Sequence, residues 1–68
     1  MSIISERLKY LRTSKGLTQE NLAKKLNTTN SSISDWECGR SSPSAEMIKE
    51  IALFFDVRTD YLLGLEDE

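Results

Sequence analysis

The stretch from Thr18 to Arg40 constrains the fold of this chain most strongly, because it carries two short apolar patterns of helical spacing with a break between them. The apolar positions are Leu22, Ala23, Leu26, Ile33 and Trp36. In the break, Asn27 can adopt the left-handed conformation that ends a helix, and the hydroxyl of Thr29 can accept the first free N–H of the next helix. The sequence therefore predicts two helices joined by a tight turn.

The second of these helices is expected to present a small polar surface. If it begins near residue 30, Ile33 and Trp36 turn inward, and hydrogen-bonding side chains remain outside. Those outer side chains are Asn30, Ser31, Ser34 and Asp35. A helix surface of this kind suits the major groove of DNA, where side chains touch base edges. The same residues also fit an ordinary solvated face.

The helix pair and its surroundings resemble the helix-turn-helix of the phage repressor and Cro family, also called the XRE family. The features that carry the resemblance are Thr18-Gln19, Leu22-Ala23, Ile33-Ser34, Trp36-Glu37 and Gly39. The likeness runs from about residue 7 to residue 64 and includes RLKYLRTSKGLTQ and DYLLG. It implies an all-α, compact, five-helix lambda-repressor-like domain over residues 1–65, followed by an acidic tail at 66–68. It also implies a sequence-specific transcriptional regulator, most often a repressor, that binds a palindromic operator in double-stranded DNA as a homodimer.

The resemblance assigns base contacts to the first turns of the second helix of the pair, on Asn30, Ser31, Ser34 and Asp35. Asn30 is the strongest candidate, because an amide can pair with adenine through two hydrogen bonds. Asp35 has two readings: its carboxylate can accept a hydrogen bond from a cytosine amino group, or it can repel phosphates and stay away from DNA. Trp36 is expected to pack in the core rather than stack on a base.

Phosphate contacts are implied at the start of the first helix, in the turn, and in the loop after the second helix. These positions are Gln19, Asn27, Thr28, Ser32, Arg40, Ser41 and Ser42. Gln19 would act beside the free N–H groups of its own helix, which favour an anion. Ser32 can instead face the preceding helix, and the loop serines can be simple polar loop residues.

The resemblance further implies an ion pair between Arg12 and Glu37, with a mainly structural role. It also implies a two-fold contact near the end of the chain, for which the candidates are Phe54, Arg58, Tyr61 and Leu65. The same four residues can simply close the core. The acidic end at 66–68 is expected to fray.

Cap signals delimit the remaining helices. The first predicted helix can start at either Ser2 or Ser5 and stops near Gly16. Thr18 is the expected cap of the next, with Asn21 in place of the usual Glu and therefore a weaker capping box. Ser44, Asp56 in the left-handed conformation, Thr59 and Gly64 delimit the last two helices.

The length and composition of the chain limit the classes of function that are expected. The 68 residues suffice for one small domain, and no apolar run approaches the roughly 18 residues of a membrane span. The start of the chain lacks the features of a signal peptide, so a cytoplasmic location is expected. The chain has no His, no metal-ligand spacing and one Cys, Cys38, so neither an enzyme nor a site for a metal, a cofactor or a small molecule is expected.

The charges are unevenly distributed, although the net charge is only −2. Residues 1–34 carry six basic and two acidic side chains, whereas residues 35–68 carry three basic and nine acidic ones. A basic front and an acidic back are compatible with phosphate binding at the basic side. The negative total and the acidic residue on the second helix instead favour the alternative, a protein-interaction module of the adaptor or antitoxin type on the same fold.

Overall fold

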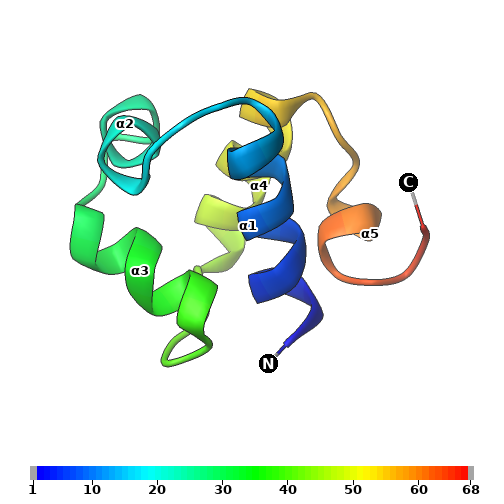
Figure 1. The fold of residues 1–68 in the computed structure, drawn as a ribbon. Coiled ribbons are helices and arrows are strands. Elements are labelled where there is room, and N and C mark those ends of the chain that lie inside the picture. Colours follow the sequence, from blue (N-terminus) through cyan, green and yellow to red (C-terminus); the bar gives the residue numbers. More distant parts are fainter. Residues whose placement is uncertain (1, 68) are drawn as a thin grey trace.

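The computed structural model describes residues 2–67 of the chain (Figure 1). The helices are α1 (Ile3–Ser14), α2 (Gln19–Lys25), α3 (Asn30–Cys38), α4 (Ala45–Phe55) and α5 (Thr59–Leu62). No strand occurs among residues 2–67, and the expected all-α, five-helix fold is confirmed. The Cα trace measures 28 × 23 × 21 Å.

The central helix of the domain is α1, which contacts α3 on one side and α5 on the other. Contacts also join α2 to α3 and α4 to α5. As Figure 1 shows, the α2–α3 pair therefore forms one edge of the molecule, and α5 lies at the opposite edge. None of the helices in residues 2–67 is both long enough and apolar enough to span a membrane.

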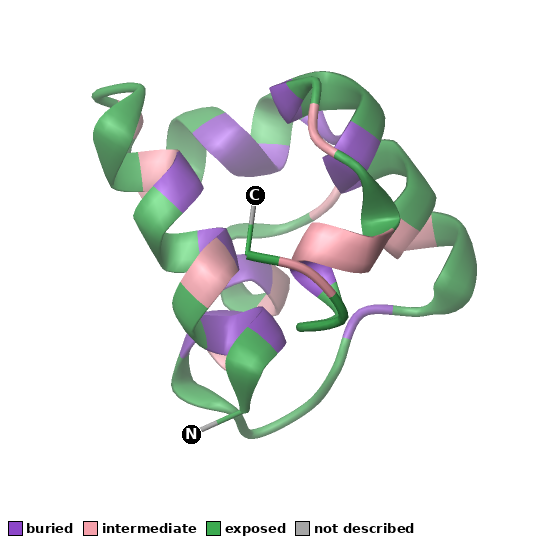
Figure 2. Cartoon of the chain, turned by 90° about the vertical axis from the view of Figure 1, so that its right-hand side faces the viewer, coloured by how far each residue is buried: buried purple, intermediate pink, exposed green. Residues whose placement is uncertain are grey.

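The core draws one fully buried aliphatic side chain from each helix. These side chains are Leu8, Leu22, Ile33, Ile51 and Leu62. In Figure 2 the buried segments of the helices face the interior, and the exposed segments form the outside. Each such side chain contributes about 1.5–3 kcal/mol through its removal from water. Trp36 completes this core with an exposed fraction of 9%, as the sequence analysis expected.

Hydroxyl side chains cap the first four helices. Ser2 is the cap of α1, since its Oγ accepts the Ser5 N–H at 3.3 Å, whereas Ser5 is buried within the helix. Thr18 accepts the Asn21 N–H at 3.0 Å, and Asn21 Oδ1 accepts the Thr18 N–H at 3.4 Å. The capping box thus forms with Asn21, and its second bond is long. Thr29 and Ser44 cap α3 and α4 in the same way.

The expectation that Thr59 caps α5 is wrong. Thr59 is the first helical residue, Arg58 stands at the cap position, and no side chain caps this helix. The shift by one residue takes the Thr59 hydroxyl past the place where it could accept a free N–H. The four-residue α5 is held instead from outside, through a contact of its own backbone with α1.

Arg7 of α1 makes that contact, which the sequence analysis did not anticipate. Its Nη1 donates to the carbonyl oxygens of Tyr61 at 2.5 Å and Glu66 at 2.6 Å, and its guanidinium lies 4.4 Å from the centre of the Tyr61 ring. The Glu66 carboxylate also pairs with Arg58 Nε at 2.8 Å. The expected fraying is therefore wrong at Glu66, while residue 68 lies outside the described residues. A domain boundary at residue 65 stays a prediction.

Each helix in the described part of the chain ends in the same reversal. The left-handed residues are Gly16, Asn27, Gly39, Asp56 and Gly64. After each of them, an N–H group donates back to the carbonyl five residues earlier, at 2.8 to 3.1 Å. Asn27 at φ 57° and Asp56 at φ 56° are confirmed as the left-handed ends of α2 and α4.

A buried ion pair links α1 to α3. Arg12 donates to Glu37 through Nε at 2.6 Å and through Nη2 at 3.0 Å. The two side chains retain only 12% and 2% of their exposure. Arg12 Nη1 also donates to the carbonyl oxygen of Leu17 at 2.7 Å, so the guanidinium fixes the loop that leads into α2 as well.

We expect Arg12→Ala to lower the free energy of unfolding by about 3–5 kcal/mol, because the Glu37 carboxylate would stay buried without a counter-charge. The double variant Arg12→Met, Glu37→Leu should recover most of this loss, since no buried charge remains in it. Urea denaturation measures both values. An Arg12→Ala protein as stable as the wild type would show that the pair does not hold α1 to α3.

We expect Asp56→Gly to raise the free energy of unfolding by about 0.5–1 kcal/mol, because glycine adopts the left-handed conformation without steric cost. The matched control is Asp56→Ala, which also removes the carboxylate but keeps Cβ, and which should be less stable than the wild type. The same denaturation series measures both. If the two variants behaved alike, the carboxylate rather than the backbone would set the stability at this position.

Candidate nucleic-acid interface

The outer surface of α3 carries the predicted base contacts. Asn30 and Ser31, in its first turn, are exposed, whereas Ser34 and Asp35, one turn later, are half-buried. Ile33 has no exposed surface and turns into the core. The alternation follows from the 3.6-residue repeat of the helix, which keeps the polar positions together on the side away from α1. The expected separation into an apolar inner face and a polar outer face is confirmed.

Arg40 folds back onto this polar face. Its Nε donates to Asp35 Oδ1 at 2.9 Å, and its Nη2 donates to Ser34 Oγ at 3.3 Å. The reversal at Gly39 makes this possible, because it turns the chain back after the last turn of α3. The hydrogen bond that Arg40 donates to Asp35 is the main cause that raises the pKa of Arg40 above its ordinary value. The pair between Asp35 and Arg40 was not expected from the sequence. An acidic and a basic residue that flank a helix-ending glycine can nevertheless indicate such a pair.

Gln19 occupies the first position of α2 and is half-buried. Its Nε2 donates to Glu37 Oε1 at 3.2 Å, so the amide is tied to the Arg12–Glu37 pair rather than free in solvent. Because phosphates only accept hydrogen bonds, a phosphate contact of Gln19 would use the second N–H of that amide or the free backbone N–H groups of α2. The phosphate contact of Gln19 stays a prediction, and its hydrogen bond to Glu37 was not expected from the sequence.

The remaining predicted phosphate contacts flank α3 at its two ends. Asn27 is exposed and Thr28 half-buried in the turn before α3, whereas Ser41 and Ser42 are exposed in the loop after it. Ser32 is half-buried, and its Oγ lies 3.0 Å from the hydroxyl of Thr29, the cap of the same helix. The Ser32 side chain thus contacts the cap of its own helix, whereas a phosphate or the preceding helix was expected to face it. Its phosphate contact stays a prediction.

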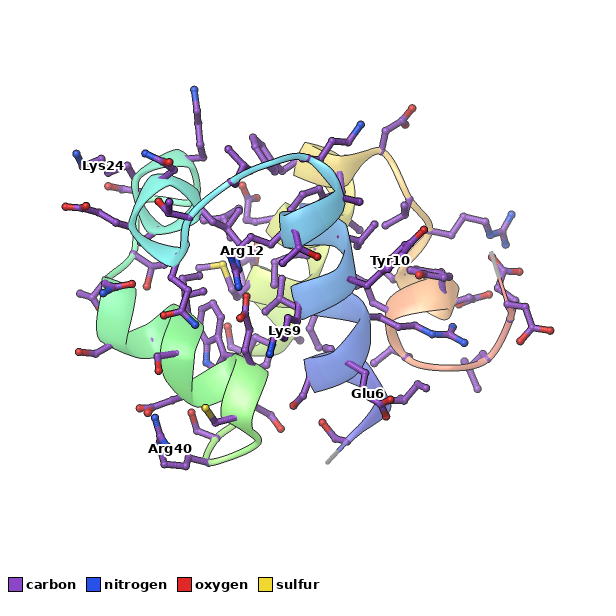
Figure 3. All side chains as sticks on the ribbon, viewed as in Figure 1. Glu6, Lys9, Tyr10, Arg12, Lys24 and Arg40 are labelled. Atoms are coloured by element: carbon purple, nitrogen blue, oxygen red, sulfur yellow. The ribbon has the colours of Figure 1, made fainter. Side chains whose placement is uncertain are left out.

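Basic side chains bracket the same edge of the molecule. Figure 3 shows Lys24 beside α2 and Arg40 at the far end of α3, both on the side of the domain that α2 and α3 form. Lys24 is exposed and enters none of the ion pairs described here. Lys24 can therefore meet a phosphate on the α2 side of the polar face of α3, while Arg40 is paired with Asp35 at the other end.

The four predicted dimer residues lie near the opposite edge. Phe54 has an exposed fraction of 40% and packs edge-on against Phe55, whereas Leu65 is exposed to 74%. Arg58 pairs with Asp60 as well as with Glu66, and the half-buried Tyr61 lies beneath Arg7. Two further leucines are exposed nearby: Leu53 lies on α4, and Leu63 directly follows α5.

Residues 2–67 contain no pocket and no group of three or more side chains that could hold a metal ion.

Comparison with known proteins gives related regulators over nearly the whole chain. A family model described as helix-turn-helix matches residues 8–62. The HTH-type transcriptional activator BcrR of Enterococcus faecalis is 46% identical over 63 residues, which are 93% of this chain and 31% of that protein. An HTH-type transcriptional regulator of Methanocaldococcus jannaschii is 38% identical over 65 residues, 96% of this chain and 98% of that protein.

A repressor is also among the similar proteins. Repressor protein CI of Enterobacteria phage phi80 is 38% identical over 66 residues, which are 97% of this chain and 28% of that protein. This chain spans 31% to 56% of the length of several bacterial regulators that it matches. By the family model and by its match to nearly the whole archaeal regulator, the chain belongs to the helix-turn-helix family of DNA-binding transcriptional regulators.

Proposed function

We propose that this protein recognises a specific sequence in double-stranded DNA with α3 in the major groove and represses transcription from the site it occupies. The observation that carries the proposal is the polar outer face of α3, which stands at an edge of the domain between two basic side chains. A helix that is anchored by Ile33 and Trp36 and exposes short polar groups can approach base edges without steric obstruction.

Base reading is assigned to Asn30, Ser31, Ser34 and Asp35. Asn30 stands in the first turn of α3, the part of a recognition helix that contacts base edges, and its amide matches the N6 and N7 groups of adenine. Ser31 is equally exposed and can donate or accept. Ser34 and Asp35 hold Arg40 at the same face of α3, because both accept hydrogen bonds from its guanidinium.

Phosphate contacts are assigned to residues on both sides of α3. They are Gln19, Asn27, Thr28, Ser32, Ser41 and Ser42. These groups hold the register of α3 on the duplex and carry no sequence information themselves. Arg40 was expected among them, but its hydrogen bond to Asp35 supports a different role.

The proposed active form is a homodimer on a palindromic operator. Half-sites about one helical turn, or about 34 Å, apart match two domains whose Cα traces measure 21 to 28 Å across. Phe54, Arg58, Tyr61 and Leu65 are the proposed contact, supported by the exposed apolar surface of Phe54 and Leu65 at the edge away from α3.

Repression is the simplest outcome for a dimer that occludes a promoter, and the similar proteins include both a repressor and an activator. A reporter gene with the selected operator placed over the promoter distinguishes the two: expression should fall when this protein is present. A rise in expression would replace repressor by activator and leave DNA recognition untouched.

Selection of sites from random duplexes, followed by titration at two salt concentrations, tests DNA recognition itself. The wild type should enrich a two-fold symmetric sequence and bind it with an affinity that falls as salt rises. Enrichment of no sequence would favour the protein-interaction module of the same fold.

Asn30→Ala should relax the base preference at one position of each half-site, with a loss of discrimination of about 1–3 kcal/mol there. The other positions should keep their preferences, because the helix is anchored by buried side chains that this change leaves in place. Selection with the variant measures the effect, and Lys49→Ala, an exposed change on α4, is the control. Unchanged discrimination at every position would remove Asn30 from the base contacts.

Leu65→Glu should convert the homodimer to a monomer and weaken operator binding by about 100-fold, since the two half-sites would no longer be bound together. The control is Lys49→Glu, which places the same side chain at an exposed position of α4 outside the proposed contact. Sedimentation gives the mass and titration gives the affinity. A Leu65→Glu dimer with wild-type affinity would exclude this surface from the contact between subunits.

A further inference from the structure

Arg40, Asp35 and Ser34 form a connected group on the polar face of α3. Arg40 Nε lies 2.9 Å from Asp35 Oδ1, and Arg40 Nη2 lies 3.3 Å from Ser34 Oγ. Ser34 and Asp35 are adjacent on the helix, and Arg40 reaches both from beyond the reversal at Gly39. Two acceptors on one helix thus fix the plane of a guanidinium whose backbone lies outside that helix.

The group does little for the stability of the fold. The side chains of Arg40 and Asp35 keep 62% and 43% of their exposure, and ion pairs this open to water contribute little to folding. The buried Arg12–Glu37 pair serves that purpose instead. An exposed but doubly bonded guanidinium at a recognition surface is therefore better explained by what it can bind.

The hydrogen bonds to Asp35 and Ser34 use two of the five N–H donors of Arg40. Three donors remain that Asp35 and Ser34 do not use, two on Nη1 and one on Nη2. Adjacent donors at the end of a guanidinium match the O6 and N7 acceptors of guanine, which lie side by side in the major groove. A guanidinium held by a carboxylate also loses less conformational freedom on binding than a free side chain.

The pairing also resolves the difficulty that Asp35 creates at this surface. A lone carboxylate close to DNA is repelled by the phosphates and has only the amino groups of cytosine and adenine as partners in the major groove. With Arg40 bonded to it, the local charge is balanced, and the outer side of the pair presents donors rather than acceptors. Asp35 can then stay on the recognition helix without opposing its approach.

We propose that Arg40 reads a guanine in each half-site and that Asp35, with Ser34, positions its guanidinium for that contact. Arg40 is then a specificity-determining residue rather than a phosphate anchor, and Asp35 acts through Arg40 rather than on a cytosine. The inference rests on the proposed function, because it needs α3 to lie in the major groove.

The test compares wild type, Arg40→Lys, Asp35→Asn and the double variant by selection from random duplexes and by titration at several salt concentrations. Wild type should select a guanine at one position of each half-site. Arg40→Lys keeps the charge but cannot donate two parallel hydrogen bonds to guanine. It should therefore lose discrimination at that position by roughly 5- to 150-fold and keep the base preferences at the other positions.

Asp35→Asn should relax the same position, because the amide no longer holds the guanidinium by charge. The slope of the logarithm of its binding constant against the logarithm of the salt concentration should become steeper by about one counterion, since the released Arg40 can then reach a phosphate. The double variant should discriminate no worse at that position than Arg40→Lys alone. Circular dichroism and melting temperatures verify that each variant is folded, and Lys49→Ala controls for an exposed change away from α3.

Other outcomes separate the failures. If Arg40→Lys bound every sequence as the wild type does while Arg40→Ala weakened all of them alike, Arg40 would be a phosphate contact and the inference would be wrong. A change at a different position in Asp35→Asn would mean that Asp35 reads a base directly, and tighter binding to all sequences would mean that it only repels DNA. If the wild type enriched no sequence, the proposed function itself would fail.

Discussion

The bidentate pair between Arg12 and Glu37 is the interaction on which the working surface of this domain depends. It joins the central helix to the C-terminal part of α3 at 2.6 and 3.0 Å, and it holds the loop before α2 through the Leu17 carbonyl. Gln19 donates to the same carboxylate. The buried Glu37 carboxylate thus fixes α1, α2 and α3 relative to one another. The orientation of the polar face of α3 depends on these contacts.

Two arginine–carboxylate pairs of this chain differ in their expected roles. Arg12 and Glu37 are buried, so the pair is costly to break and acts on the fold. Arg40 and Asp35 are open to water, so the pair contributes little to the stability of the fold and can serve recognition. The same chemistry therefore has a structural or a binding role according to how much solvent surrounds it.

Most of the fold could be predicted from the sequence, because helical periodicity and cap residues are local signals. The bounds of α3, its buried Ile33 and Trp36, and the left-handed Asn27 and Asp56 follow from them. Contacts between distant residues could not be predicted in this way: Arg7 on Tyr61 and Glu66, and Gln19 on Glu37, depend on how the helices pack. The Thr59 cap failed by a single residue, which is the usual precision of a helix boundary.

The five aliphatic side chains that meet in the core, one from every helix, have a mechanical consequence. Because each helix contributes one of them, a displacement of α3 would withdraw Ile33 from a core that the other four helices share. Small single domains unfold as one cooperative unit, so we expect the backbone of α3 to keep its place until the whole domain unfolds. If α3 enters the major groove as proposed, adaptation on contact falls to exposed side chains such as Asn30 and to the shape of the duplex.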